Sequence, residues 1–136
     1  MPVIETGAIF HNAAPAVLYE LFIDSEKHSA ATGAPAKISH KVGGKWSAHG
    51  GMISGKNLVL VPNRMIVQTW RSNEWKAAEL DSIVVVRFEK SASGGASVSL
   101  AHVGVPEYDH KDVTQGWINF YWDPWRKYLK GRKSKS

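Results

Sequence analysis

Residues 115–129 read QGWINFYWDPWRKYL, and this stretch places six aromatic side chains within fifteen positions. Their spacing is typical of an amphipathic helix, because residues three or four positions apart share a helical face. One face of the predicted helix collects Val113, Trp117, Phe120, Tyr121, Pro124 and Tyr128. Pro124 cannot donate a backbone hydrogen bond, so we expect the helix to bend there. So much aromatic surface cannot remain in water, and the rest of the chain is therefore expected to cover it.

The middle of the chain has the pattern of β-strands. Apolar and polar residues alternate in short segments, which are separated by glycine, proline or asparagine. The predicted strands are residues 3–11, 38–42, 45–49, 52–61, 65–71, 82–90 and 96–103. Two short helices are predicted between the first two strands, over residues 16–22 and 25–31. We therefore predict an α+β fold in which a curved antiparallel sheet holds the C-terminal helix.

The alternation within each strand also predicts which side chains face that helix. Val84, Val86 and Phe88 are expected to point inward, and Val98, Leu100 and His102 should share one face of the next strand. Trp46 and Ala48 are expected to point inward, with Lys45, Ser47 and His49 pointing outward. One face of the sheet is thus apolar.

The length and composition are those of one ordinary domain. A chain of 136 residues can bury roughly two-thirds of its unfolded surface. The absence of cysteine excludes disulfides and thiolate metal sites and fits a reducing compartment. The N-terminus lacks the pattern of a secretory signal, and no apolar run approaches the roughly 20 residues that cross a bilayer. We therefore predict a cytoplasmic protein without a membrane span.

The formal net charge of +5 comes from one end of the chain. Six of the 17 basic residues lie within residues 126–136, which leaves 11 basic and 12 acidic residues elsewhere. A nucleic-acid-binding surface is expected to spread its basic side chains over a folded face. A solvated end therefore explains this cluster better than a nucleic-acid or membrane contact. We predict one domain over residues 1–130, a basic disordered tail over residues 131–136, and no nucleic-acid partner.

Three segments have the order and spacing of one family. They are GGKWSAHGGMISGKNLVLVPNRMIVQTWRSNEW (residues 43–75), LAHVGVP (residues 100–106) and GWINFYWDPWRKYL (residues 116–129). They resemble the homologues of the activator of the heat-shock-protein-90 ATPase, within the START and birch-pollen-allergen-like (SRPBCC) superfamily. The resemblance implies a helix-grip fold with an apolar cavity between sheet and helix. Lipid binding, polyketide cyclisation and chaperone regulation all occur in this superfamily, so the fold alone does not choose a function.

Our first hypothesis is a binding domain for a hydrophobic or aromatic small molecule, because apolar and aromatic side chains usually line ligand cavities. The expected ligand-binding residues are Trp46, Trp70, His102, Gly116, Trp117 and Tyr121. Gly116 would leave space for a ligand, and His102 would supply a polar group on an apolar face. A simpler interpretation also stands, in which the aromatic rings fill the core and His102 is a buried, hydrogen-bonded ring.

Two other hypotheses remain. Trp75, in a loop, and Trp122, at the edge of the apolar helix face, are expected at the surface, where aromatic residues often mark interfaces. They favour a chaperone-associated or stress-response interaction protein. A polyketide cyclase or aromatase-like enzyme would use His102 with Tyr121 as acid or base.

We favour a non-catalytic protein and predict no catalytic residue, metal ligand or cofactor. Residues 43–47 (GGKWS) lack the upstream glycine of a phosphate-binding loop. No two histidines are four positions apart, as a helical zinc site requires. The sequence leaves the identity of the ligand and the oligomeric state open.

Overall fold

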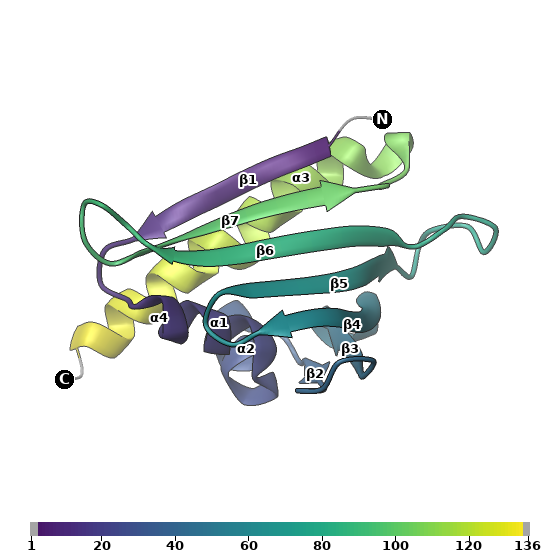
Figure 1. Ribbon diagram of the computed structural model, residues 1–136. Coiled ribbons are helices and arrows are strands. Elements are labelled where there is room, and N and C mark those ends of the chain that lie inside the picture. The colour runs from purple at the N-terminus through teal and green to yellow at the C-terminus, as the bar shows by residue number, and fades with distance from the viewer. Residues whose placement is uncertain (1–2, 135–136) are drawn as a thin grey trace.

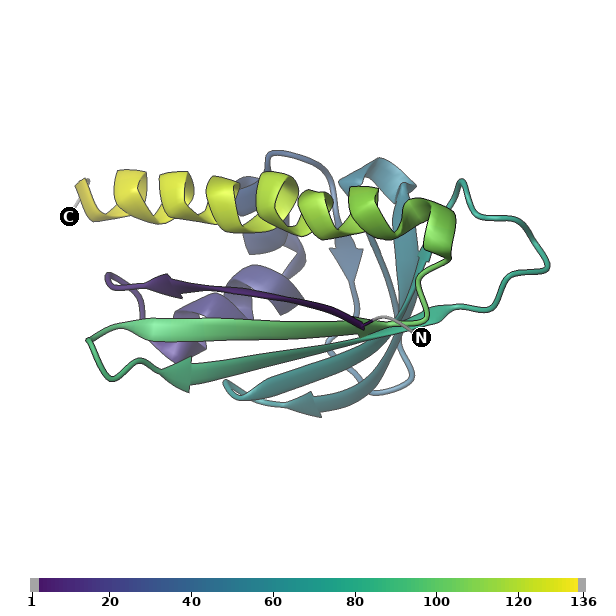
Figure 2. The same cartoon turned by 90° about the horizontal axis from the view of Figure 1, so that it is seen from above.

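The computed structural model describes residues 3–134, with side chains placed up to residue 131. Its centre is a seven-stranded sheet in which all neighbours are antiparallel, in the order β1-β7-β6-β5-β4-β3-β2 (Figure 1). The strands are β1 (Val3–Phe10), β2 (Lys37–Ile38), β3 (Lys45–Ala48), β4 (Ile53–Val61), β5 (Met65–Ser72), β6 (Ser82–Lys90) and β7 (Ala96–Val103). The long C-terminal helix lies across one face of this sheet (Figure 2). The predicted helix-grip fold is confirmed.

Two short helices, α1 (Pro15–Ile23) and α2 (Ser25–Thr32), connect β1 to β2. α1 begins at Pro15, whose missing N–H group is not needed in the first turn of a helix. Asp24 separates the helices and caps α2, because its side chain accepts a hydrogen bond from the backbone N–H of Lys27 at 3.0 Å. α1 packs against β6 and β7, and α2 packs against the C-terminal helix.

The strands β6 and β7 have the predicted bounds and the predicted faces. The inward residues Val84, Val86, Phe88, Val98, Leu100 and His102 are all buried. The register places Val84 opposite His102 and Val86 opposite Leu100. Period-two alternation is therefore enough to define this part of the core.

One predicted strand is wrong. The pattern predicts a strand over residues 38–42, but β2 ends at Ile38 and the chain turns through residues 39–44. The buried side-chain amide of Asn57 donates to the carbonyl oxygens of Ser39 and Lys41, at 2.7 and 3.1 Å. These carbonyls bond to a distant side chain instead of a neighbouring strand, which the local pattern does not reveal.

The C-terminal helix has three parts: α3 (His110–Trp117), the π-helical segment η3 (Ile118–Trp122) and α4 (Asp123–Ser134). It follows the short 3₁₀ turn η2 (Glu107–Asp109). A π-helical turn holds one residue more than an α-helical turn, which rotates all later side chains by about 100°. The extra residue brings five buried side chains onto one face: Val113, Trp117, Trp122, Trp125 and Leu129.

The predicted face of this helix is therefore wrong in two places. Phe120 is assigned to the buried face by regular spacing, but its side chain is 56% exposed. Trp122 is expected at the surface, but it is 3% exposed and its indole N–H donates to Oγ1 of Thr6 at 3.1 Å. The irregular turn ends just before Asp123 and Pro124, beside the proline at which we predict a bend.

Trp75 is also buried, against the prediction that it lies at the surface. Its ring packs against Trp70 with the ring centres 5.4 Å apart, and its indole N–H donates to Oδ2 of Asp109 at 2.7 Å. The loop after β5 thus folds back onto the start of the C-terminal helix.

α4 continues to Ser134, past residue 131 where we predict the tail to begin. Residues 135–136 of that predicted tail lie outside the described residues. No helix in the described part of the chain is long and apolar enough to cross a membrane.

Candidate functional site

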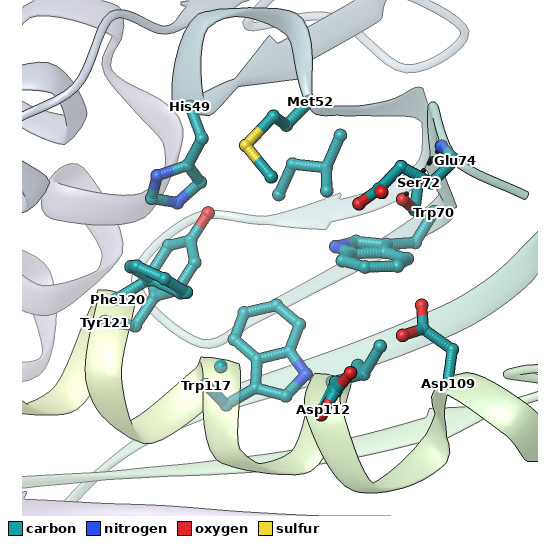
Figure 3. A pocket seen from close by; sticks show the side chains of 13 residues that line it. His49, Met52, Trp70, Ser72, Glu74, Asp109, Asp112, Trp117, Phe120 and Tyr121 are labelled. Atoms are coloured by element: carbon teal, nitrogen blue, oxygen red, sulfur yellow. Dashed lines mark hydrogen bonds between the residues drawn. The ribbon is translucent and has the colours of Figure 1, made fainter.

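A pocket of about 230 Å³ lies between the C-terminal helix and the strands β4 and β5 (Figure 3). One side is formed by the short turn η1 (His49–Gly51) and by the adjoining ends of β4 and β5, and the other by α3 and η3. The lining residues are His49, Met52, Ile53, Trp70, Ser72, Glu74, Asp109, Asp112, Val113, Gly116, Trp117, Phe120 and Tyr121.

Trp70 and Trp117 form the main apolar walls of this pocket. Their ring centres are 6.3 Å apart and their planes are tilted by 44°. Tyr121 extends the wall formed by Trp117, and the centres of the two rings lie 4.8 Å apart. Gly116 leaves space at the opening because it has no side chain. A Cβ atom added there would fill part of this space and contact the Phe120 ring at 3.6 Å, an ordinary van der Waals distance. Such apolar walls with a few polar groups are typical of sites for small organic molecules.

The indole nitrogen of Trp70 has no hydrogen-bond partner, although the side chain is only 6% exposed. The N–H groups of Trp46, Trp75, Trp117 and Trp122 all find acceptors, whereas that of Trp125, which does not line the pocket, is likewise buried without one. A buried donor without an acceptor costs about 1–3 kcal/mol. Figure 3 shows this nitrogen directed into the pocket, where a ligand could supply the acceptor.

Tyr121 and His49 supply further polar atoms on the side away from Trp70 (Figure 3). Nδ1 of His28 donates to the carbonyl of Phe22 at 2.9 Å, so Nε2 of His28 accepts from the Tyr121 hydroxyl at 3.1 Å. Burial raises the pKa of Tyr121, which keeps the phenol neutral and leaves its oxygen able to accept. Nε2 of His49 is buried without a partner, and burial lowers the pKa of His49.

Three carboxylates, from Glu74, Asp109 and Asp112, line the pocket away from His49, and we call them the acidic rim (Figure 3). Glu74 and Asp112 are exposed, whereas Asp109 is half-buried and bonded to Trp75. No lysine or arginine lines the pocket, and among the described side chains none of these carboxylates forms an ion pair. The rim therefore gives the pocket a negative potential.

His102 contacts the rings of both wall tryptophans but does not line the pocket. Its Nδ1 accepts from Nε1 of Trp117 at 3.2 Å. The Ser82 hydroxyl donates to the carbonyl of Trp70 at 2.8 Å, so it accepts from Nε2–H of His102 at 2.7 Å. Burial lowers the pKa of His102 to about 3, with a smaller contribution from the charge of His110. The ring is a satisfied neutral group that positions the walls, and it has no free nitrogen to offer a substrate.

The sequence profile described as "Activator of Hsp90 ATPase homolog 1-like protein" matches residues 12–130. The chain belongs to this family. It is 31% identical over 103 residues to the activator of 90 kDa heat shock protein ATPase homolog of Dictyostelium discoideum, covering 76% of this chain and 27% of that protein. It is 30% identical over 109 residues to the human homolog 1, covering 80% and 32% of the two chains. The chain thus spans about a third of the length of these relatives.

Solved structures show the same fold. The crystal structure of an HSP90 activator from Plasmodium falciparum has a TM-score of 0.77 and 25% identity, covering 89% of this chain and 91% of the other. The solution structure of the Aha1 dimer from Colwellia psychrerythraea has a TM-score of 0.76 and 16% identity, covering 90% and 92%. The predicted membership in the Hsp90-activator-like family is confirmed.

Four of the six predicted site residues meet at the pocket of this Hsp90-activator-like chain: Trp70, Gly116, Trp117 and Tyr121. His102 and Trp46 lie outside it. Trp46 donates its indole N–H to the carbonyl of Thr69 at 3.1 Å, and a Cβ on Gly55 would lie 2.8 Å from the same nitrogen. Trp46 thus packs against Gly55 of the neighbouring strand β4 and does not form a wall of the pocket.

The prediction that His49 points outward is wrong. The strand β3 ends at Ala48, and His49 has a φ of 52°, so its half-buried ring turns into the pocket. Gly50 and Gly51 follow with φ values of 67° and 93°. This Gly-Gly pair is the signal in the sequence that alternation stops at Ala48. Asp109 and Asp112 of the acidic rim are also missing from the predicted site, because they lie at the start of the C-terminal helix, in η2 and α3.

Proposed function

We propose that this Hsp90-activator-like chain binds a small, mostly apolar organic molecule in the pocket lined by Trp70 and Trp117. The observation that carries the proposal is the unpaired N–H of Trp70 in the wall of a largely apolar cavity. The nitrogen of Trp125 is also buried without a partner, but only that of Trp70 belongs to a residue that lines this pocket, where a ligand could reach it. The pocket is smaller than the roughly 300–1,000 Å³ typical of drug-sized ligands, which favours a molecule with one ring.

The indole N–H signals of the six tryptophans provide the test, in a two-dimensional ¹H–¹⁵N NMR titration with 2-phenylethanol. Binding of 2-phenylethanol in the pocket should shift the signals of Trp70 and Trp117. The signal of Trp46 should stay in place, because its N–H is bonded to Thr69 outside the pocket. An unchanged spectrum at millimolar 2-phenylethanol contradicts the proposal.

The variant Gly116→Leu tests the location without disturbing the core, because Gly116 lies at the half-exposed edge of the pocket. The new side chain should fill the opening and weaken binding of 2-phenylethanol at least tenfold. Gln115→Leu is the matched control, since it adds the same side chain one position away at an exposed site that does not line the pocket. Equal binding by both variants would place the ligand elsewhere.

A second candidate function is regulation of a chaperone ATPase, and the family match favours it. The relatives matched over 103 and 109 residues are named as activators of the 90 kDa heat shock protein ATPase. We test it by measuring ATP hydrolysis by Hsp90 with and without this chain. Stimulation that survives Gly116→Leu would make the chaperone function independent of the pocket.

A further inference from the structure

The walls, polar atoms and charges of the pocket together define a ligand class, and this inference rests on the proposed ligand binding. We propose that the ligand is an organic amine. Its apolar body packs against Trp70 and Trp117, and its ammonium group meets the acidic rim of Glu74, Asp109 and Asp112. An acceptor atom on the body pairs with the N–H of Trp70.

The charge around the pocket selects a cation. The three carboxylates of the rim line the pocket together with no lysine or arginine, and they have no ion-pair partner among the described side chains. His49 does not offset them, because burial favours its neutral form. A negatively charged ligand would be repelled by this arrangement, whereas an ammonium group would be attracted.

The cation is organic because the carboxylates and the walls act on different parts of one molecule. Within residues 3–131 no group of three or more His, Cys, Asp or Glu side chains could hold a metal ion. Carboxylates accept hydrogen bonds and an ammonium group donates three, so they are matched partners. The aromatic walls give no coordination but offer a large contact area for an apolar body.

The unpaired indole nitrogen of Trp70 requires a polar atom on the apolar body of the ligand. The Trp70 side chain is only 6% exposed, and its Nε1 is directed into the pocket without an acceptor (Figure 3). It requires an oxygen or another acceptor on the ligand. Tyr121 donates its proton to His28, so its oxygen can accept from a hydroxyl on the same ligand. A phenol that carries a short aminoalkyl chain has all three features.

Three probes with the same phenol ring test the choice of charge. They are tyramine, which is a cation, 4-(2-hydroxyethyl)phenol, which is neutral, and 4-hydroxyphenylacetate, which is an anion. We expect tyramine to bind about three- to tenfold more tightly than the neutral probe, since one exposed ion pair is weak but two or three act together. The anion should bind most weakly. The preference for tyramine should shrink in 0.5 M sodium chloride, because salt screens exposed charges.

The double variant Glu74→Gln/Asp112→Asn tests the residues. It should reduce the preference for tyramine over the neutral probe by at least half, with Asp109 supplying the remainder. Asp109 is kept because its carboxylate holds Trp75. Glu107→Gln is the matched control: it removes one exposed carboxylate of the same helix start that does not line the pocket. It should retain the preference.

The outcomes separate this inference from the proposed function. If none of the three probes shifts Trp70 or Trp117 in the NMR spectrum, both fail. If the neutral probe binds as well as tyramine, or if the anion binds best, the pocket binds ligands but the amine assignment is wrong. A preference for tyramine that is undiminished in the double variant also overturns the assignment to the acidic rim.

Discussion

The indole N–H of Trp117 donates to Nδ1 of His102 at 3.2 Å and joins the C-terminal helix to strand β7. The other ring nitrogen of His102 donates to Ser82, whose hydroxyl donates to the carbonyl of Trp70. Each hydrogen bond in this series has a fixed donor and a fixed acceptor. A second proton, on Nδ1 of His102, would therefore face the N–H of Trp117 and break their hydrogen bond. The wall of the pocket therefore depends on a neutral histidine.

The first prediction concerns the pH dependence of stability. Burial lowers the pKa of His28 to about 4 and that of His102 to about 3, both below the ordinary value of 6.5. The unfolded chain binds more protons below pH 6.5, so the stabilisation is complete above 6.5 and is lost as pH falls toward these folded-state values. Each histidine contributes about 1.4 kcal/mol per pH unit, or about 3–4 kcal/mol for both between pH 7 and pH 5.

Urea unfolding at pH 7.5, 6.5, 5.5 and 5.0 measures this loss above the range in which most carboxylates titrate. The variant His102→Gln should show about half of the pH-dependent change, whatever its stability at pH 7.5. A free energy of unfolding that is constant from pH 7.5 to 5.0 would show that the two rings do not need to be neutral.

The second prediction compares one substitution at two glycines. Gly55→Ala should destabilise the protein by about 1–3 kcal/mol, because the new Cβ would lie 1.9 Å from the carbonyl oxygen of Thr69. Gly116→Ala should stabilise it by about 0.5–1 kcal/mol, since the helix has space there and alanine is the better helix former. Thermal unfolding of both variants gives the signs, and shifts in the same direction would contradict the packing at one of the two sites.

The third prediction tests the π-helical segment. Trp122→Ala should cost about 3–5 kcal/mol because the ring is buried and bonded to Thr6. Phe120→Ala should change the free energy of unfolding by no more than about 0.5 kcal/mol, since that ring is mostly exposed. A helix without the extra residue would bury Phe120, and the larger cost would then fall on Phe120→Ala in urea denaturation.

The fourth prediction concerns the loop between β2 and β3. Asn57→Ala should destabilise the protein by at least about 2 kcal/mol, because it leaves the carbonyl of Ser39 and the amide of Gln68 without their partner and removes one of the two donors to the carbonyl of Lys41. Amide hydrogen exchange should also become faster at Gly43, whose N–H bonds to the carbonyl of Asn57. Asn119→Ala, an exposed residue of the helix, is the control and should leave both measurements nearly unchanged.

The sequence by itself determined the sheet, the two short helices and the long covering helix. The strands β6 and β7 have their predicted bounds because alternation along Val84, Val86 and Phe88 is a local property of the backbone. The helix face was predictable as far as Trp117, where the chain keeps its regular period. Trp70, Gly116 and Trp117, three of the six predicted site residues, lie in these regular elements.

Only the tertiary structure decided which residues complete the pocket and which leave it. Trp122 is buried because it meets Thr6, 116 positions earlier, and Tyr121 is held by His28, 93 positions earlier. His49 enters the pocket where a left-handed turn ends the strand, and His102 leaves it because two hydrogen bonds satisfy both ring nitrogens. A local pattern records the period of one element. The register of an irregular helix and the partner of a buried polar atom depend on contacts between distant elements, and only the packed fold contains them.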